Sequence, residues 1–224
     1  MTDPSAPTRV VVVGGGFAGV NCARALVKHS DRVEVTLLDR NDYHQFQPLL
    51  YQVATSMLAP GDIAYPLRKI AAEYDNLSAH RRDVISVDPV ARSVTTASGE
   101  TYTGDYLVLA AGSQPSFFGT PGAEHAFPLY SLDDAERLRT RIIQAFEEAD
   151  WDAGRADDGA ITFVIVGGGP TGVEVAGALS EMIATRWFTS SPSSLPRRRC
   201  TSSITAMRSS RCSLTRGTST PLTD

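Results

Sequence analysis

The chain is poor in cysteine and has no long apolar run, and both shortages limit what it can be. Its 224 residues include three cysteines, which form neither a Cys-x-x-Cys motif nor a paired framework. We therefore predict no metal site and expect reducing, cytoplasmic surroundings. No stretch of about 18 apolar residues occurs, so no membrane-spanning helix is predicted. The polar N-terminus lacks the pattern of a signal peptide.

Lysine is absent from the last part of the chain. Residues 188–224 contain six Arg, no Lys and one acidic residue, while the whole chain has a net charge of −4. This small charge predicts no nucleic-acid partner. Ser and Thr fill 17 of these 37 positions without helical or strand periodicity, as in a disordered tail. Because the change is abrupt, we favour the hypothesis of an aberrant, frameshifted tail on a truncated chain, which the downstream DNA read in three frames would test.

Two glycine-rich turns are the most informative features that are present. The motif Gly-x-Gly-x-x-Gly occurs at residues 14–19 and again at 167–172, each time after a valine-rich run. One such motif is a weak signal, but both lie between a predicted buried strand and a predicted helix. The sequence therefore predicts a protein that holds two dinucleotides and passes a hydride between them.

The first turn carries the residues that a dinucleotide needs. Gly14 permits the tight turn, Gly16 lets a pyrophosphate approach the backbone, and Gly19 lets the helix pack against the strand. The helix that follows offers N–H groups and a positive dipole end to the phosphates. Asp39 lies 20 residues after Gly19, where a carboxylate accepts hydrogen bonds from an adenosine ribose. This acid favours FAD or NAD over a 2′-phosphorylated cofactor; the alternative is a glycine turn without a ligand.

Hydrophobic periodicity predicts an α/β fold along most of the chain. Ser131 and Asp134 form a capping box at the start of one helix. The expected elements are strands at 9–13, 32–39 and 106–110, a loop at 41–51, helices at 17–29 and 62–73, a strand pair 84–87 with 93–96, a helix after Ser131, and a strand, turn and helix within 161–181. The strands at 9–13 and 106–110 are expected to be buried, and Leu138, Ile142 and Phe146 to share one face of their helix. Together with the two glycine turns, the resemblance described next implies an incomplete Rossmann-like FAD/NAD(P)-binding fold of the two-dinucleotide-binding flavoprotein type. Its expected parts are the N-terminal segment of an FAD-binding domain (1–118), the start of an NADH-binding domain (119–187) and the tail (188–224).

The loop 41–55, NDYHQFQPLLYQVAT, resembles that of type II NADH dehydrogenases, as does APGDIAYPLR at 59–68. These are single-subunit respiratory NADH:quinone oxidoreductases with FAD, and the resemblance covers about residues 8–187. It implies hydride transfer from NADH to FAD and onward reduction of a quinone. It also implies that the loop packs around the flavin, with Gln52 and Ala54 near the isoalloxazine ring. No cysteine lies between residues 22 and 200, so the dithiol relay of the related disulfide reductases is excluded.

A further segment, 101–113, resembles the second flavin motif of these proteins, whose glycine end passes close to FAD. The alternative is an ordinary buried strand that enters a turn. A lone His beside Tyr and Gln, such as His44, is more often a hydrogen-bonded packing residue than a proton shuttle. The predicted FAD contacts are Gly14, Gly16, Phe17, Ala18, Gly19, Asp39, Arg40, His44, Gln52, Ala54, Ala111 and Gly112.

The resemblance assigns the second turn to NADH. In the family, the acid that matches Glu174 lies between nicotinamide and flavin, so Glu174 and Gln52 are the predicted catalytic residues. The alternative for Glu174 is an acid in the first helical turn, favoured by the helix dipole. The second ribose acid is expected near residue 192, where the chain has neither strand pattern nor acid, so NADH binding is expected to be impaired. The predicted NADH contacts are Gly167, Gly169, Pro170, Thr171, Gly172 and Glu174.

The resemblance further implies a quinone partner, a possible homodimer and peripheral attachment to the inner face of the cell membrane. The amphipathic helices that make this attachment in the family are expected to be missing here, which predicts a cytoplasmic, impaired fragment. Two alternatives remain: a soluble NADH-dependent reductase of a ferredoxin- or rubredoxin-like protein, and an inactive fragment. A yellow protein that oxidises NADH with menaquinone distinguishes the enzyme from the fragment.

Overall fold

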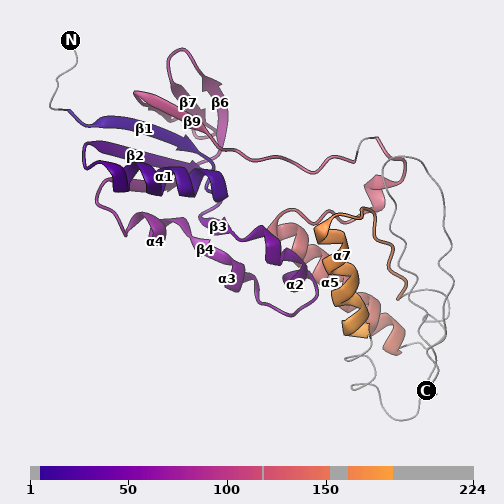
Figure 1. Ribbon diagram of the computed structural model, residues 1–224. Coiled ribbons are helices and arrows are strands. Elements are labelled where there is room, and N and C mark those ends of the chain that lie inside the picture. The colour runs from indigo at the N-terminus through magenta and orange to yellow at the C-terminus, as the bar shows by residue number, and fades with distance from the viewer. Residues whose placement is uncertain (1–5, 118, 152–160, 184–224) are drawn as a thin grey trace. The chain divides into compact units, whose positions relative to one another are not determined.

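The computed structural model describes residues 6–117, 119–151 and 161–183, which belong to two compact units (Figure 1). The first unit comprises residues 1–46 and 61–121, and the second comprises 47–60 and 122–224. The second unit thus takes up residues 47–60, which the sequence analysis grouped with residues 1–118. The proposed tail and the second ribose acid expected near residue 192 lie outside the described residues.

The first unit is built on a parallel sheet with the strand order β5-β2-β1-β9. Its elements are β1 (Thr8–Val13), α1 (Phe17–His29), β2 (Val33–Asp39), β5 (Leu77–Arg81) and β9 (Tyr106–Leu109). Helix α1 connects β1 to β2 and lies along the sheet (Figure 1). In register, Val12 pairs with Leu37 on one side and with Val108 on the other. This confirms the predicted α/β fold.

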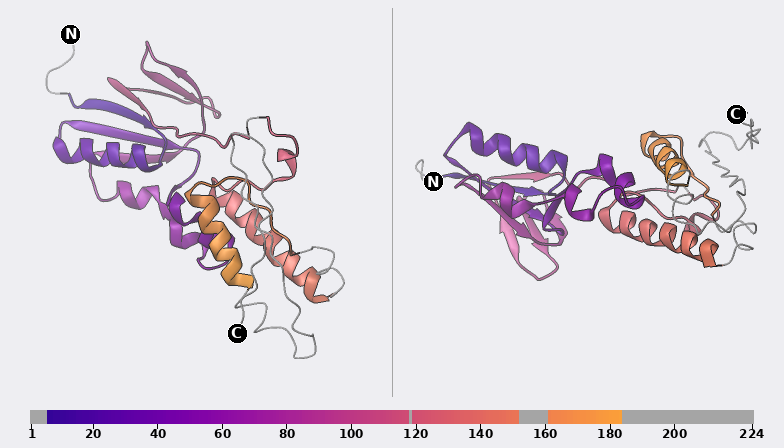
Figure 2. Two further views of the ribbon diagram at one scale, coloured as in Figure 1. Left: turned by 45° about the vertical axis from the view of Figure 1, so that its right-hand side comes forward. Right: turned by 90° about the horizontal axis from the view of Figure 1, so that it is seen from below.

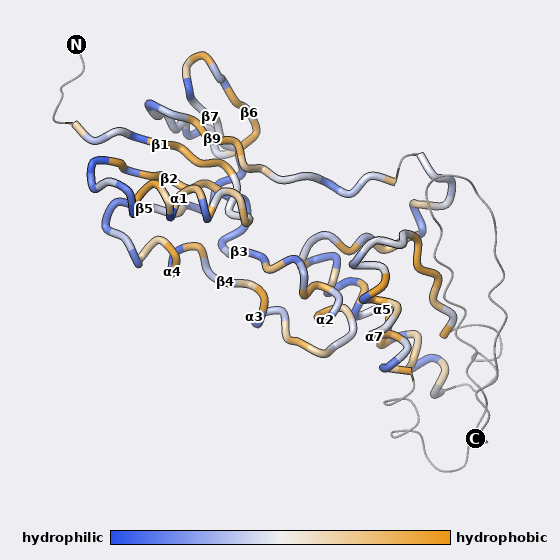
Figure 3. Tube along the Cα trace, viewed as in Figure 1, coloured by the Kyte–Doolittle hydropathy of each residue, from blue (hydrophilic) through white to orange (hydrophobic). Residues whose placement is uncertain are grey.

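The valine run of β1 is buried on both faces of this sheet. Val10 and Val12 pack with the apolar stripe of α1, whereas Val11 and Val13 pack on the opposite face with Leu38. Alternate side chains of a strand point to opposite faces, so a continuous apolar run is the pattern of a strand covered on both sides. Hydrophobic residues accordingly follow one another in β1 (Figure 3).

The segment that follows β2 differs from its prediction. The expected helix at 62–73 is interrupted: it consists of α3 (Pro60–Ile63), β4 (Ala64–Pro66) and α4 (Leu67–Ala71). A proline disfavours helical backbone in the residue before it, here Tyr65. Strand β4 pairs antiparallel with β3 (Tyr43–Gln45), inside the expected loop 41–51. The apolar residues therefore do have helical spacing, but the proline and the pairing of β4 with β3 determine the backbone conformation.

A small antiparallel sheet, β6-β7-β8, completes the described part of the first unit. Its strands are β6 (Val84–Asp88), β7 (Ser93–Thr96) and β8 (Thr101–Thr103). The predicted pairing of 84–87 with 93–96 is confirmed. Beside it, Arg82 donates a hydrogen bond to Glu100, and this bond is the main cause that holds the pKa of Glu100 below its usual range.

Strand β9 was expected to be buried, but it is not. Tyr106 is 63% exposed and Leu109 is 59% exposed. Among the described residues, β9 is an edge strand, with β1 on one side only. A sequence pattern shows that a residue is apolar, whereas its burial depends on which other parts of the chain cover it.

The second unit is helical where it is described. Its elements are the 3₁₀ turns η1 (Gln47–Leu49) and η2 (Ala123–His125) and the helices α2 (Leu50–Ala54), α5 (Leu132–Trp151) and α7 (Pro170–Met182). Helix α2 packs against both α5 and α7, which run beside each other (Figure 2). Ile142 of α5 and Leu179 of α7 lie at the centre of the apolar cluster between them. Leu138 and Phe146 join it, as the helical period predicted.

The prediction of a strand before the second glycine turn is wrong. Residues 163–166 form only a single-residue bridge at Val166. Val164 is 64% exposed and Val166 is 66% exposed. A strand exists through its hydrogen bonds to a neighbour, and the described residues of this unit offer it no partner strand.

The capping box at the start of α5 is confirmed. The Ser131 hydroxyl accepts a hydrogen bond from the Asp134 N–H at 3.2 Å, and the Asp134 carboxylate accepts one from the Ser131 N–H at 2.9 Å. We expect Ser131→Ala to lower the free energy of unfolding by about 1 kcal/mol, because a backbone donor loses its partner. Urea denaturation measures the effect. Thr140→Ala, on the same helix, is the control and should be nearly neutral; an equal loss in both variants would contradict the capping role.

Within the described ranges, no helix is long and apolar enough to cross a bilayer. In the same residues, His, Cys, Asp and Glu form no group of three or more that could hold a metal ion.

Candidate dinucleotide site

The first glycine turn is closely packed at Gly14 and Gly19. Gly14 has φ +110°, a conformation that residues with a side chain rarely adopt. A Cβ on Gly14 would overlap the carbonyl oxygen of Ala110, and a Cβ on Gly19 would overlap that of Gly14. Both glycines are therefore required by the fold itself.

The middle of the turn is open instead. Gly16 has φ −76°, and a Cβ there would meet no atom within 4 Å. Gly16, Phe17 and Ala18 are exposed, whereas Gly14, Gly15 and Gly19 are buried. No side chain caps α1, and its first turn holds no acid. The backbone N–H groups at this helix start thus have no side-chain cap, and the open space beside Gly16 leaves them accessible to an anion.

Asp39 ends β2 directly beside this turn. Its carboxylate accepts a hydrogen bond from the Gly15 N–H at 2.5 Å and from the Asn41 N–H at 2.7 Å. The exposed Arg40 follows, and its carbonyl oxygen accepts a hydrogen bond from Arg81 at 3.1 Å. Each carboxylate oxygen can accept a second bond, so Asp39 can still receive a ribose hydroxyl.

Gly15 is a site residue that the sequence analysis missed. A Cβ on Gly15 would lie 2.6 Å from a methyl carbon of Leu67 and 3.3 Å from Cβ of Asp39. It occupies a position that the motif leaves free, so only the run of three consecutive glycines could have drawn attention to it.

His44 lies against the same turn. Its Nδ1 lies 2.9 Å from the Gly15 carbonyl oxygen. A carbonyl only accepts hydrogen bonds, so Nδ1 is the donor and carries the proton. The imidazole meets the ring of Phe17 edge-on at 4.9 Å, and Phe46 packs on Phe17 at 5.5 Å. These contacts are those of a hydrogen-bonded packing residue.

The end of β9 closes the turn from the other side. The Ala110 N–H donates to the Val13 carbonyl at 2.8 Å, which holds Ala110 over Gly14. The exposed Ala111 and Gly112 follow directly, and Gly112 has φ +74°. The fold thus brings residues from 14–19, 39–44 and 110–112 to the same edge of the sheet.

The second turn has the same local geometry. Gly167 has φ +115°, and a Cβ on Gly172 would overlap the Gly167 carbonyl oxygen. Gly169 precedes α7, which begins with Pro170 and Thr171 and has no side-chain cap. Proline suits this first helical position because its missing N–H would have no partner there.

Glu174 lies exposed in the second turn of α7, and the first turn holds no acidic residue. The first-turn position assumed in the alternative interpretation is therefore wrong, whereas the exposure of Glu174 agrees with the solvated acid that it expected. A contact of Glu174 with nicotinamide stays a prediction.

Gln52 and Ala54 belong to α2 of the second unit. The Gln52 amide donates to the Tyr51 hydroxyl at 3.1 Å, and its backbone carbonyl accepts from the Met57 N–H at 2.7 Å. Ala54 is fully buried. Their placement near a flavin ring stays a prediction.

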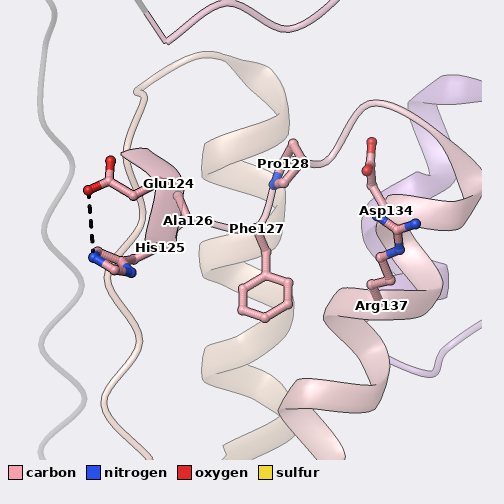
Figure 4. A pocket seen from close by; sticks show the side chains of 7 residues that line it. All are labelled: Glu124, His125, Ala126, Phe127, Pro128, Asp134 and Arg137. Atoms are coloured by element: carbon pink, nitrogen blue, oxygen red, sulfur yellow. Dashed lines mark ion pairs between the residues drawn. The ribbon is translucent and has the colours of Figure 1, made fainter. Parts of the chain in front are cut away.

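A separate surface hollow lies in the second unit (Figure 4). Its lining consists of Glu124, His125, Ala126, Phe127, Pro128, Asp134 and Arg137. It includes none of the predicted site residues, and its Asp134 carboxylate is already bonded in the capping box. The exposed Glu124 and His125 form only a 3.6 Å surface ion pair, so this hollow is not a candidate site.

Comparison with known proteins agrees with this geometry. Two type II NADH:quinone oxidoreductases of Mycobacterium tuberculosis, NdhA and Ndh, are 44% and 42% identical to the chain over 179 and 183 residues. These matches cover 78% of this chain and 38% of each relative, so the chain spans about two fifths of their length. The solved structure of NDH2 from Plasmodium falciparum shares the fold, with a TM-score of 0.71 at 20% identity over 83% of this chain and 39% of that one.

Residues 8–204 also match the sequence profile of a family described as pyridine nucleotide-disulphide oxidoreductases. Both glycine turns and Asp39 fall within this range. By this match over most of its length, the chain belongs to the pyridine nucleotide-disulphide oxidoreductase family.

Proposed function

We propose that this chain supplies the FAD-binding turn and the first part of the NADH site of a type II NADH:quinone oxidoreductase. The observation that carries the proposal is the pair of uncapped glycine turns with matching geometry, in a chain 44% identical to NdhA over 179 residues. One turn would serve FAD and the other NADH, so that a hydride passes from NADH to the flavin.

At the first turn, the chain's own groups bind and orient the cofactor. The N–H groups from Gly16 to Gly19 hold the pyrophosphate at the start of α1, and Asp39 accepts a hydrogen bond from the adenosine ribose. Phe17, Ala18, Arg40, Ala111 and Gly112 are solvent-exposed near the same edge of the sheet, so we expect them to contact the dinucleotide. When bound, the flavin supplies the hydride-accepting and electron-transferring chemistry.

At the second turn, the start of α7 offers the same N–H groups to the NADH pyrophosphate. We propose that Glu174 and Gln52 act at the nicotinamide and the flavin ring, as the family resemblance implies. No cysteine occurs between residues 22 and 200, so this segment provides no dithiol relay. The electrons would therefore leave the flavin directly, to a quinone, a protein acceptor or oxygen, and the family resemblance favours the quinone.

For the full-length protein we propose, from the same resemblance, homodimer formation and peripheral attachment to the inner face of the cell membrane. Both properties belong to the whole enzyme, of which this chain corresponds to about two fifths.

The test is a flavin-reduction experiment on the 224-residue chain purified with FAD. We expect a yellow protein whose flavin absorbance is slowly bleached by NADH under anaerobic conditions and restored by menaquinone. Slow bleaching is expected because no acid stands near residue 192 to hold the NADH ribose. A folded but colourless chain would overturn the proposal. Restoration by a rubredoxin-like protein but not by menaquinone would favour the soluble reductase instead.

A further inference from the structure

Gly15 is held at both of its peptide groups by side chains from elsewhere in the fold. On one side, its N–H donates to the Asp39 carboxylate at 2.5 Å. On the other side, its carbonyl oxygen accepts from His44 Nδ1 at 2.9 Å. Gly15 is buried, and a side chain on it would require the neighbouring Leu67 side chain to shift.

Because the peptide bond is planar, these contacts fix the direction in which the neighbouring N–H and carbonyl groups point. In a trans peptide, the carbonyl of one residue and the N–H of the next point in opposite directions. Because His44 holds the Gly15 carbonyl, the Gly16 N–H points away from His44. Gly16 is exposed, and a Cβ there would meet no atom within 4 Å. The peptide on the other side is fixed in the same way: the Gly15 N–H points to Asp39, so the Gly14 carbonyl points away from Asp39, and its oxygen lies against Gly19.

We propose that His44 is a positioning residue: its Nδ1–H, together with Asp39, clamps Gly15 and aims the Gly16 N–H at the pyrophosphate of the bound dinucleotide. This inference rests on the proposed FAD site and deepens it. His44 itself does not touch the phosphates. It keeps the turn in its binding conformation before the ligand arrives, so that binding does not have to order this backbone.

The ring contacts of His44 are a separate feature that the test must set apart from its hydrogen bond. His44→Phe keeps a ring against Phe17 but removes the donor. His44→Asn loses the ring but places an amide N–H where Nδ1 lies. His80→Phe is the matched control, because His80 is another strand histidine of the first unit whose ring lies 6.1 Å from that of Tyr102.

Calorimetric titration of the 224-residue chain with ADP and with FAD measures the effect. ADP carries the pyrophosphate and ribose without the flavin, so its binding does not depend on contacts with the flavin ring. We expect His44→Phe to weaken ADP binding about tenfold, the effect of one hydrogen bond, while His44→Asn and His80→Phe stay within about twofold of wild type. Unchanged binding in His44→Phe, or equal weakening in His44→Asn, would overturn the proposal.

A second readout needs no ligand. In NMR spectra of the free chain, the Gly15 carbonyl carbon and the Gly16 amide nitrogen should shift in His44→Phe and return in His44→Asn. Unmoved signals in a folded His44→Phe protein would contradict the clamp. If wild type binds neither ADP nor FAD, the proposed function fails, but these shifts still decide the clamp. Should His44→Phe not fold, the smaller His44→Leu removes the same donor.

Discussion

Gly14→Ala should destabilise the protein by more than about 3 kcal/mol, a large part of the 5–15 kcal/mol that holds a typical domain together. The alanine would have to adopt φ +110°, and its Cβ would overlap the Ala110 carbonyl oxygen. Ala110 cannot move aside easily, because its N–H is bonded to Val13 in the sheet. Thermal and urea unfolding of the variant measure the loss.

Gly99→Ala is the matched control for this variant. Gly99 also has a positive φ, +84°, but a Cβ there would meet nothing within 4 Å. It therefore carries the conformational strain without the collision, and we expect a loss of about 1–2 kcal/mol. If Gly14→Ala is no more destabilising than Gly99→Ala, the close approach of β9 to the turn is not what makes Gly14 necessary.

Gly16→Ala should have the opposite profile, with an intact fold and lost cofactor binding. Its φ of −76° suits any residue and its Cβ would point into open space, so stability should change by less than about 0.5 kcal/mol. That open space is where we place the pyrophosphate, and a methyl group would occupy it. We expect the dissociation constant for FAD to rise at least about 100-fold, which corresponds to roughly 2.8 kcal/mol.

Flavin fluorescence during FAD titration measures this loss, with unfolding experiments on the same sample. Gly61→Ala is the control, because a Cβ on Gly61 also meets nothing within 4 Å and this residue lies outside the turn. FAD binding at wild-type strength by Gly16→Ala would place the pyrophosphate elsewhere and would remove the main structural support for the first site.

The sequence alone was sufficient to predict the first strand, the first helix and the position of the acid that follows them. Helix α1 begins and ends at the predicted residues, and β1 and β2 match their predicted bounds within one residue. These elements are readable because their signals are local: a valine run, a helical period and a glycine turn between them. The capping box of Ser131 and Asp134 was equally local and is equally well formed.

The failures share a different cause. The helix expected at 62–73 breaks where Pro66 and the pairing of β4 with β3 override the apolar period. The strand expected at 163–166 has no described neighbour to bond with, and β9 is exposed because only β1 flanks it. In each case the outcome depends on a partner that is distant in sequence, and a periodic pattern carries no information about that partner.

By itself, the sequence determined the family, the two glycine turns and the residue types able to receive two dinucleotides. Only the tertiary structure decided how each glycine is used: Gly14 and Gly19 for close packing, Gly16 for open approach, and Gly15 as the residue held between Asp39 and His44. The physical reason is that a glycine motif specifies where side chains are missing. At Gly14 and Gly15, what occupies that space comes from Ala110, Asp39 and Leu67, which are distant in sequence and which folding alone brings to the turn.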